Sequence, residues 1–315
     1  MKKRLYVDFH VLQTVPPSCI NRDDTGSPKT AIYGGVTRAR VSSQAWKHAM
    51  RQAFVEESLL DEEDVGKRTK KVTELVEKEI AALAPEKDAA KLAKKTLDNA
   101  GIKNDEKGTK ALFFISQAQI KALAQLAVEE CADKKEYKKA LSTAPSADIA
   151  LFGRMVADDP SLNFDAAAQV AHSISTHAVQ NEYDYFTAVD DCQVEDNAGA
   201  GHLGTVEYNS ATLYRYATVN VMELERHLDA EKAAEVVRSF GEAFIRSMPT
   251  GKQNTFANRT LPDAVYVTIR EDQPVNLCGA FERAVRKSAE GYAEPSKSAL
   301  QAYACLLYTS PSPRD

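Results

Sequence analysis

The sequence predicts an α+β fold in which a mixed body is interrupted by a helical insertion. Residues 1–55 and 146–304 combine strand-like alternation with amphipathic helical segments, whereas residues 56–145 are rich in Lys, Glu, Ala and Leu at helical spacing. Two long strand-like segments flank a glycine-rich stretch and predict a projecting β-hairpin over about residues 186–221. These three observations define a body, an insertion and a hairpin.

The composition is that of a soluble globular protein, with 43% hydrophobic and 27% charged residues in a chain of 315. The longest apolar run, residues 111–115, is too short to cross a bilayer, and the first residues do not form a signal peptide. The five cysteines are scattered without a CxxC pair, which is typical of reduced thiols rather than disulfides or zinc ligands. We therefore expect a cytoplasmic protein without a membrane partner, a metal or a cofactor.

The elements of the body are predicted in order along the chain. Residues 5–14 alternate as a strand, a Pro-, Asn- and Asp-rich loop follows, and residues 36–41 form a short strand. Ser42 or Ser43 caps a helix over residues 44–60. Later segments predict a helix over 164–179, strands over 186–194 and 205–221, a helix over 230–248, a strand over 264–269 and a helix from 279 to about 304.

Positive charge is concentrated at one end of this acidic sequence. Residues 1–55 hold nine Lys or Arg against three Asp, a local charge of +6, although the whole chain has a net charge of −5. Such asymmetry points to an anionic partner. The alternative is a solvated basic face without a partner.

Residues 17–51 hold the candidate site. Gln44, Lys47, His48 and Arg51 share one face of the helix that Ser42 or Ser43 begins, and a helix start of this kind binds phosphate. Cations at four further positions could extend this stripe along consecutive phosphates: Arg22, Lys29, Arg38 and Arg40. An ordinary capped helix with a wet face is the competing interpretation.

Catalytic patterns are weak in comparison. Asp23 and Asp24 are adjacent, so their side chains diverge, and His172 and His177 are five apart, which does not suit a zinc site on a helix. His48 or His202 could act as a general acid or base, but no partnered nucleophile is present. The glycine-rich stretch at 199–204 lacks the spacing of a nucleotide-binding loop and is better explained as a hairpin tip. If the hairpin projects, Leu203 is an exposed apolar wedge for bases or a cap on a neighbouring subunit.

Several long motifs, in order, closely resemble the CasC (Cse4-type) family, the backbone subunits of type I-E CRISPR Cascade complexes. They are PSCINRDDTGSPKTAIYGG at 17–35, RARVSSQAWKHAMR at 38–51, ADIALFGRM at 147–155, AHSISTHAV at 171–179, YFTAVDD at 185–191, AGHLGT at 200–205 and YRYATVNV at 214–221. The resemblance implies an RRM-like (ferredoxin-like) palm, a helical fingers insertion and a hairpin thumb. It also implies that copies polymerise along CRISPR RNA, kink it regularly and present it for pairing with target DNA, together with other Cascade subunits.

The resemblance also implies roles for single residues. Arg22, Lys29, Ser42, Gln44, Lys47 and Arg51 would line the RNA backbone track, Met155 after Arg154 and Leu203 would be wedges, and Thr187 would lie on the same track. Related type III subunits cleave RNA with an aspartate in the early loop, where Asp23 and Asp24 lie here, but the type I-E family is regarded as non-catalytic.

The last residues, 305–315, match the translation of a transposase-type sequencing adapter and are expected to be an artefact. Because family members continue well beyond residue 304, we also expect the final C-terminal elements to be missing.

Overall fold

The structure, a computed structural model, describes residues 4–105, 108–156, 159–188 and 202–309. An antiparallel sheet with the order β12–β1–β11–β9–β3–β2 forms the sheet body, and β8 and β10 also pair with β11. The mixed α+β architecture predicted from the sequence is confirmed. The body contains β1 (Tyr6–Ser18), β2 (Thr30–Tyr33), β3 (Val36–Val41), α1 (Ser43–Glu56), α6 (Ala147–Phe152), β8 (Ala168–Val170), β9 (Ser173–Ser175), β11 (His202–Asn220), α7 (Val221–Leu224), α8 (Ala230–Arg246), α9 (Gln253–Phe256), β12 (Ala264–Arg270), η3 (Leu277–Phe281) and α10 (Ala293–Thr309).

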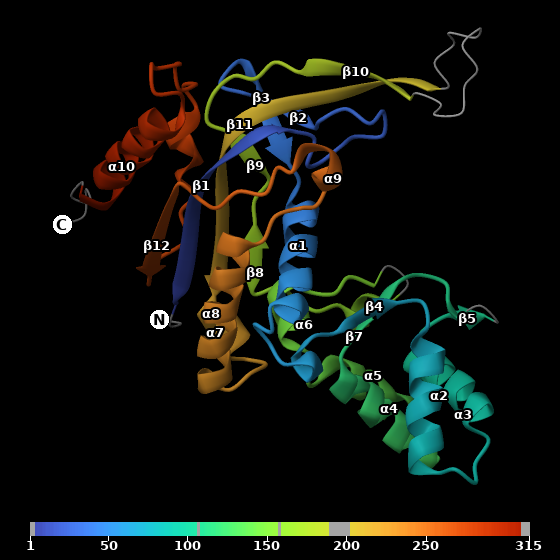
Figure 1. Cartoon of the computed structure of the whole chain (residues 1–315). Helices are drawn as coiled ribbons and strands as arrows, with labels where there is room; N and C mark the ends of the chain where they lie inside the picture. Colours follow the sequence, from blue (N-terminus) through green and yellow to red (C-terminus); the bar gives the residue numbers. More distant parts are fainter. Residues whose placement is uncertain (1–3, 106–107, 157–158, 189–201, 310–315) are drawn as a thin grey trace, which may run out of the picture.

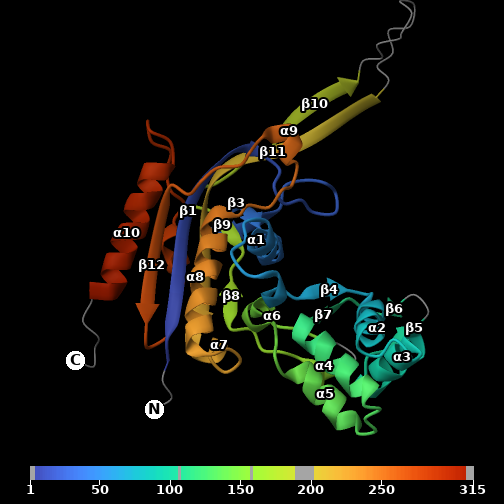
Figure 2. The same ribbon diagram turned by 60° about the horizontal axis from the view of Figure 1, so that its bottom comes forward.

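Helices cover the two faces of the sheet unequally (Figures 1 and 2). Strand β1 alternates, so that Phe9 and Val11 pack with α1 and α8 in the larger core. Leu12 belongs to a second core under η3 and α10. The sheet therefore lies between α8 with α1 on one side and α10 on the other.

The helical insertion folds as a lobe around an apolar core, which Leu162 from the later chain also joins. We call it the helical lobe, and it stands away from the sheet body beside the lower end of α1 (Figure 1). It contains η1 (Glu62–Asp64), β4 (Lys67–Thr69), α2 (Val72–Leu83), α3 (Ala89–Ala100), β5 (Asn104–Asp105), β6 (Gly108–Thr109), β7 (Phe113–Ile115), α4 (Gln117–Val128) and α5 (Lys134–Ser142). The sequence analysis did not predict its four short strands.

Strand β11 continues past the sheet and pairs with β10 (Glu182–Ala188) as a projecting hairpin (Figure 1). The pairing runs from Glu182 opposite Tyr208 to Ala188 opposite His202. The first hairpin strand begins four residues earlier than predicted. Most of the glycine-rich stretch, residues 197–201, lies outside the described residues.

The predicted helix over residues 164–179 is wrong, because this segment forms strands β8 and β9. Along β8, Ala168 and Val170 are buried and Gln169 is exposed, which is the two-residue period of a strand. Both strands pair with β11, and β9 also pairs with β3. Sheet pairing overrides a stripe of apolar residues that also fits a helix.

The helix predicted from residue 279 to about 304 begins and ends later in the structure. Asn276 caps the short η3, and the carbonyls of Phe281 and Glu282 accept hydrogen bonds from Arg38 instead of continuing a helix. Helix α10 begins only at Ala293 and runs to Thr309, past the predicted end near Ala304. In the described part of the chain, no helix combines the length and apolar character needed to cross a membrane.

Candidate nucleic-acid interface

Helix α1 begins as the sequence predicts, at a serine cap. The Ser42 hydroxyl accepts a hydrogen bond from the Ala45 amide at 3.3 Å, and Asn21 Oδ1 accepts one from the Ser42 amide at 2.9 Å. The second bond ties the loop of residues 21–29 to the helix start. Buried Trp46 donates to Ser173 Oγ at 3.0 Å and fixes the inner face of the helix on the sheet.

The outer face of α1 lines a groove of about 800 Å³ between the sheet body and the helical lobe. We call it the junction groove. All four residues of the predicted stripe line this groove: Gln44, Lys47, His48 and Arg51. Other lining residues include Arg68, Leu112, Met155 and Asp165. The Lys47 ammonium lies 5.6 Å from the centre of the Phe152 ring, and burial lowers the pKa of Lys47. A partly desolvated cation in a groove attracts an anion more strongly than one in open water.

Met155 stands at this groove with 86% of its surface exposed, which is unusual for a large apolar residue. The preceding residue, Arg154, is 5% exposed and donates to four acceptors in the helical lobe and in residues 159–164, which we call the return segment. They are the carbonyls of Leu162, Phe114 and Leu141 and the side-chain oxygen of Gln119, at 2.7–3.2 Å. Met155 is thus presented by a firmly anchored backbone.

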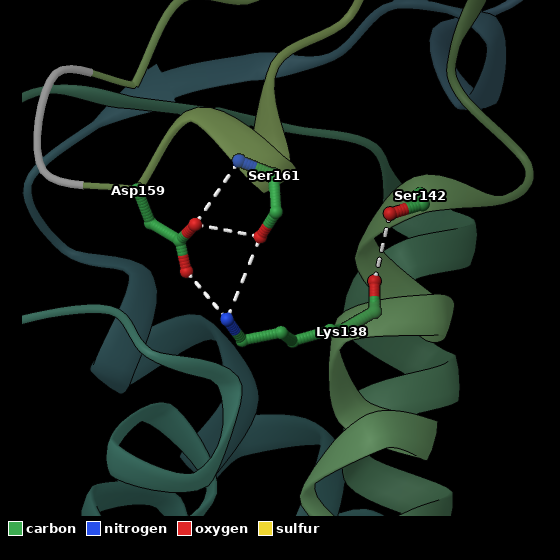
Figure 3. Close-up of polar contacts among 4 residues, drawn as sticks. All are labelled: Lys138, Ser142, Asp159 and Ser161. Carbon is green, nitrogen blue, oxygen red and sulfur yellow. Dashed lines mark hydrogen bonds and ion pairs between the residues drawn. The ribbon is translucent and has the colours of Figure 1, made fainter.

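The return segment after Met155 is also tied to the helical lobe (Figure 3). Asp159 caps η2 (Pro160–Leu162) by accepting from the Ser161 amide and hydroxyl at 3.0 and 2.6 Å. The Lys138 ammonium of α5 donates to the other Asp159 oxygen at 2.7 Å. Hydrogen bonds from Lys138 and Ser161 lower the pKa of Asp159 to about 2.

The loop of residues 21–29 carries further cations near the start of α1. Arg22 is exposed, Lys29 is half-buried, and Arg40 donates to the Thr30 carbonyl at 3.0 Å and contacts His172 Nδ1 at 3.1 Å. Burial is the main cause that lowers the pKa of His172, followed by the charges of Arg40 and Lys29. The lowered pKa means that His172 adds less positive charge to this cluster than an ordinary histidine would.

Two predicted contact residues are not available to a ligand in this structure. Arg38 is fully buried, and its guanidinium donates to the carbonyls of Tyr33, Ser175, Phe281 and Glu282. The guanidinium of Arg154 likewise donates to the buried carbonyls of Phe114, Leu141 and Leu162. Because their donors are committed to buried acceptors, both guanidinium groups hold the fold together, although Arg154 also lines the junction groove.

The hairpin residues can be placed only in part. Thr187 is exposed on β10, opposite Leu203 on β11, and His202 is the first residue of β11. The side chains of His202 and Leu203 lie outside the described residues. The hairpin projects from the far end of the sheet body relative to the helical lobe (Figure 1).

One cation that the sequence analysis did not select lies at the interface. Arg68, on β4, lines the junction groove opposite α1, within the run Lys-Arg-Thr-Lys-Lys at 67–71. The basic run was visible in the sequence, but its position facing α1 was not.

The described residues contain no group of three or more His, Cys, Asp or Glu side chains that could hold a metal ion. Asp23 Oδ1 accepts from the Thr25 amide and hydroxyl and the Ser27 amide at 2.7–3.0 Å. These bonds, that from the Thr25 hydroxyl first, lower the pKa of Asp23. Asp23 therefore organises its own loop.

A groove lined with cations, beside a loop that carries Arg22 and Lys29 and with the exposed apolar side chains of Leu112 and Met155, defines a candidate binding protein for an elongated polyanion. Solved structures of the same fold come from RNA-guided complexes. One, titled "CRISPR RNA-guided surveillance complex, pre-nicking", is 35% identical with a TM-score of 0.82, over 96% of this chain and 89% of that chain. Another, titled "CRISPR RNA-guided surveillance complex", is 32% identical with a TM-score of 0.64, over 98% of this chain and 86% of that chain.

The sequence model of the CT1975-like protein family matches residues 7–310. The chain therefore belongs to the CT1975-like family, which confirms its resemblance to the CasC (Cse4-type) backbone subunits of Cascade. A search of curated proteins finds no match.

Proposed function

We propose that this protein is a non-catalytic CRISPR RNA-binding backbone subunit of a type I-E Cascade complex in the cytoplasm. Copies would polymerise along the guide RNA, kink it at regular intervals and present it for pairing with target DNA, in contact with other Cascade subunits. In this proposal the sheet body is an RRM-like palm, the helical lobe is the fingers and the β10–β11 hairpin is the thumb.

The junction groove is the observation that carries the proposal. Lys47, Arg51 and Arg68 line it from two sides, and Met155 is exposed beside them. Cations that contact phosphates give affinity without sequence preference, which suits a guide whose bases must remain free to pair. An exposed methionine can insert between bases and displace one of them. Arg22, Lys29, Ser42, Gln44, Thr187 and Leu203 would extend this track.

The test removes two cations from the groove. For Lys47→Ala with Arg51→Ala, the slope of log K against log[salt] for single-stranded RNA should fall by about 1.4, since each phosphate contact contributes about 0.7. The matched control, Arg226→Ala with Arg238→Ala, removes the same charge from the α7–α8 side, outside the groove. Equal slopes for the groove variant and the wild type would refute the proposal.

The rival function is a metal-dependent ribonuclease that uses Asp23 or Asp24. The hydrogen bonds that Asp23 accepts within its own loop favour a structural role instead. Incubation of the assembled complex with complementary RNA and Mg²⁺ separates the two. Regularly spaced cleavage that disappears in Asp23→Ala or Asp24→Ala would establish the ribonuclease.

A further inference from the structure

Arg51, which lines the junction groove, is also the centre of a buried polar network. Its Nε donates to Asp148 Oδ2 at 2.9 Å, its Nη2 donates to the Gly66 carbonyl at 2.9 Å, and its guanidinium lies 4.5 Å from the centre of the Phe114 ring. Its Nη1 has no hydrogen-bond partner within the described ranges, and 22% of the side chain is exposed. Three contacts fix the guanidinium and leave one nitrogen for a ligand.

Asp148 holds this network from the buried side. Its side chain is fully buried, and Oδ1 accepts from the Gly66 amide at 2.8 Å and the Ser146 hydroxyl at 2.6 Å. Gly66 lies where the chain enters the helical lobe, and Ser146 lies where it returns. The two crossings touch so closely that a Cβ on Gly66 would lie 2.7 Å from Ser146 Oγ. One carboxylate therefore ties α1 to both connections between the sheet body and the helical lobe.

We propose that Asp148 is a positioning residue for guide binding, which acts through Arg51 without contacting the RNA. The inference rests on the proposed function. Asp148 fixes Arg51 in the wall of the junction groove before RNA arrives, which leaves Nη1 as the nitrogen that can donate to a phosphate, and it sets the lobe at the spacing that the groove needs. Prior orientation of a long side chain lowers the entropy that binding would otherwise cost.

Simple electrostatics predicts the opposite effect for loss of this carboxylate. Asp148→Asn removes a negative charge close to a polyanion, which by Coulomb's law alone should tighten RNA binding. If Asp148 positions Arg51, the same change should weaken binding, because a neutral amide has one acceptor oxygen and cannot accept from both Arg51 Nε and the Gly66 amide. Asp165→Asn is a matched control, since Asp165 is exposed in the same groove and has no contact with Arg51. It should tighten binding.

The experiment is a double-mutant cycle on the affinity of the full chain for single-stranded RNA, with thermal melts to verify folding. We expect Asp148→Asn to weaken binding about tenfold, Arg51→Ala to weaken it by at least as much, and the double variant to be no weaker than Arg51→Ala. Tighter or unchanged binding by Asp148→Asn, or an additive loss in the double variant, would overturn the inference.

Two further results keep the outcomes separate. If Asp148→Asn does not fold, Arg51→Lys keeps the charge but not the two-point fork, and it should bind RNA more weakly at an unchanged salt slope. Wild-type affinity of Arg51→Lys would then overturn the inference. If the Lys47→Ala variant and the Arg51→Ala variant each bind RNA like the wild type, the proposed function itself fails. If Arg51→Ala weakens binding but Asp148→Asn does not, only the role of Asp148 is rejected.

Discussion

Arg154 and Met155 are neighbours in the chain with opposite environments: the arginine is 5% exposed and the methionine 86%. The arginine is held by acceptors on β7, α4 and α5 and by the return segment, and its backbone pairs with Phe164 at 2.8 and 3.1 Å. The anchored backbone at Arg154 thus holds the exposed side chain of Met155 in place. Stability and ligand contact are divided between adjacent residues.

Met155→Ala should change RNA geometry without changing stability. Because the side chain is solvent-exposed, the free energy of unfolding should stay within about 0.5 kcal/mol of the wild type. A fluorescent base analogue in the bound RNA should become less fluorescent, since a base that Met155 displaces would stack again. Leu261→Ala, which removes another exposed apolar side chain (74% exposed) outside the groove, is the control. Equal fluorescence for all three proteins would reject the wedge.

Arg154→Ala should show the reverse pattern, a loss of stability. Removal of the guanidinium leaves the buried carbonyls of Phe114, Leu141 and Leu162 without their donor. We expect the free energy of unfolding to fall by about 3 kcal/mol, measured by urea titration. Hydrogen exchange should increase first where β7 meets α4. A stability loss below 1 kcal/mol would show that water replaces the lost donors.

The fold was predictable from the sequence where one local signal dominated. Ser42 before a run of helix formers located the start of α1, and the alternation along residues 211–221 located β11. It was not predictable where tertiary contacts decide. The residues of β8 and β9 fit a helical stripe, and only pairing with β11 makes them strands.

The site was predictable to the same extent. Helical spacing placed Gln44, Lys47 and Arg51 on one face, and all three line the groove. Strand alternation placed Arg38 beside Arg40, but it could not show that Arg38 is buried among carbonyls from residues 175 and 281–282. Arg68 was not predicted as a site residue, because only the packing of the helical lobe brings it opposite α1.

Arg68→Ala should weaken RNA binding and leave folding intact. The side chain is exposed on β4 and lines the junction groove, so it can contact one phosphate. The slope of log K against log[salt] should fall by about 0.7, with a stability change within about 0.5 kcal/mol. Arg238→Ala on α8 should leave the slope unchanged. If both variants behave alike, Arg68 lies outside the RNA track.

Protonation of buried His10 should lower the free energy of unfolding in mild acid. It is fully buried on β1, where Nδ1 contacts the Tyr214 hydroxyl at 2.9 Å, the Tyr216 ring lies 5.2 Å away and Nε2 has no partner within the described ranges. Burial, followed by the charge of Arg270, lowers the pKa of His10 to about 4. Because the unfolded chain binds a proton near pH 6.5, stability is lost as pH falls from about 6.5 to about 4.

The expected loss between neutral pH and a pH of about 5 is about 2 kcal/mol, measured by urea unfolding at both values. His10→Gln offers a side chain that can still hydrogen-bond the Tyr214 hydroxyl but cannot take up a proton, so its stability should depend less on pH by that amount. Comparison of the two proteins cancels the contribution of surface carboxylates, which both share. Parallel pH profiles for His10→Gln and the wild type would mean that His10 becomes protonated in the folded protein without cost.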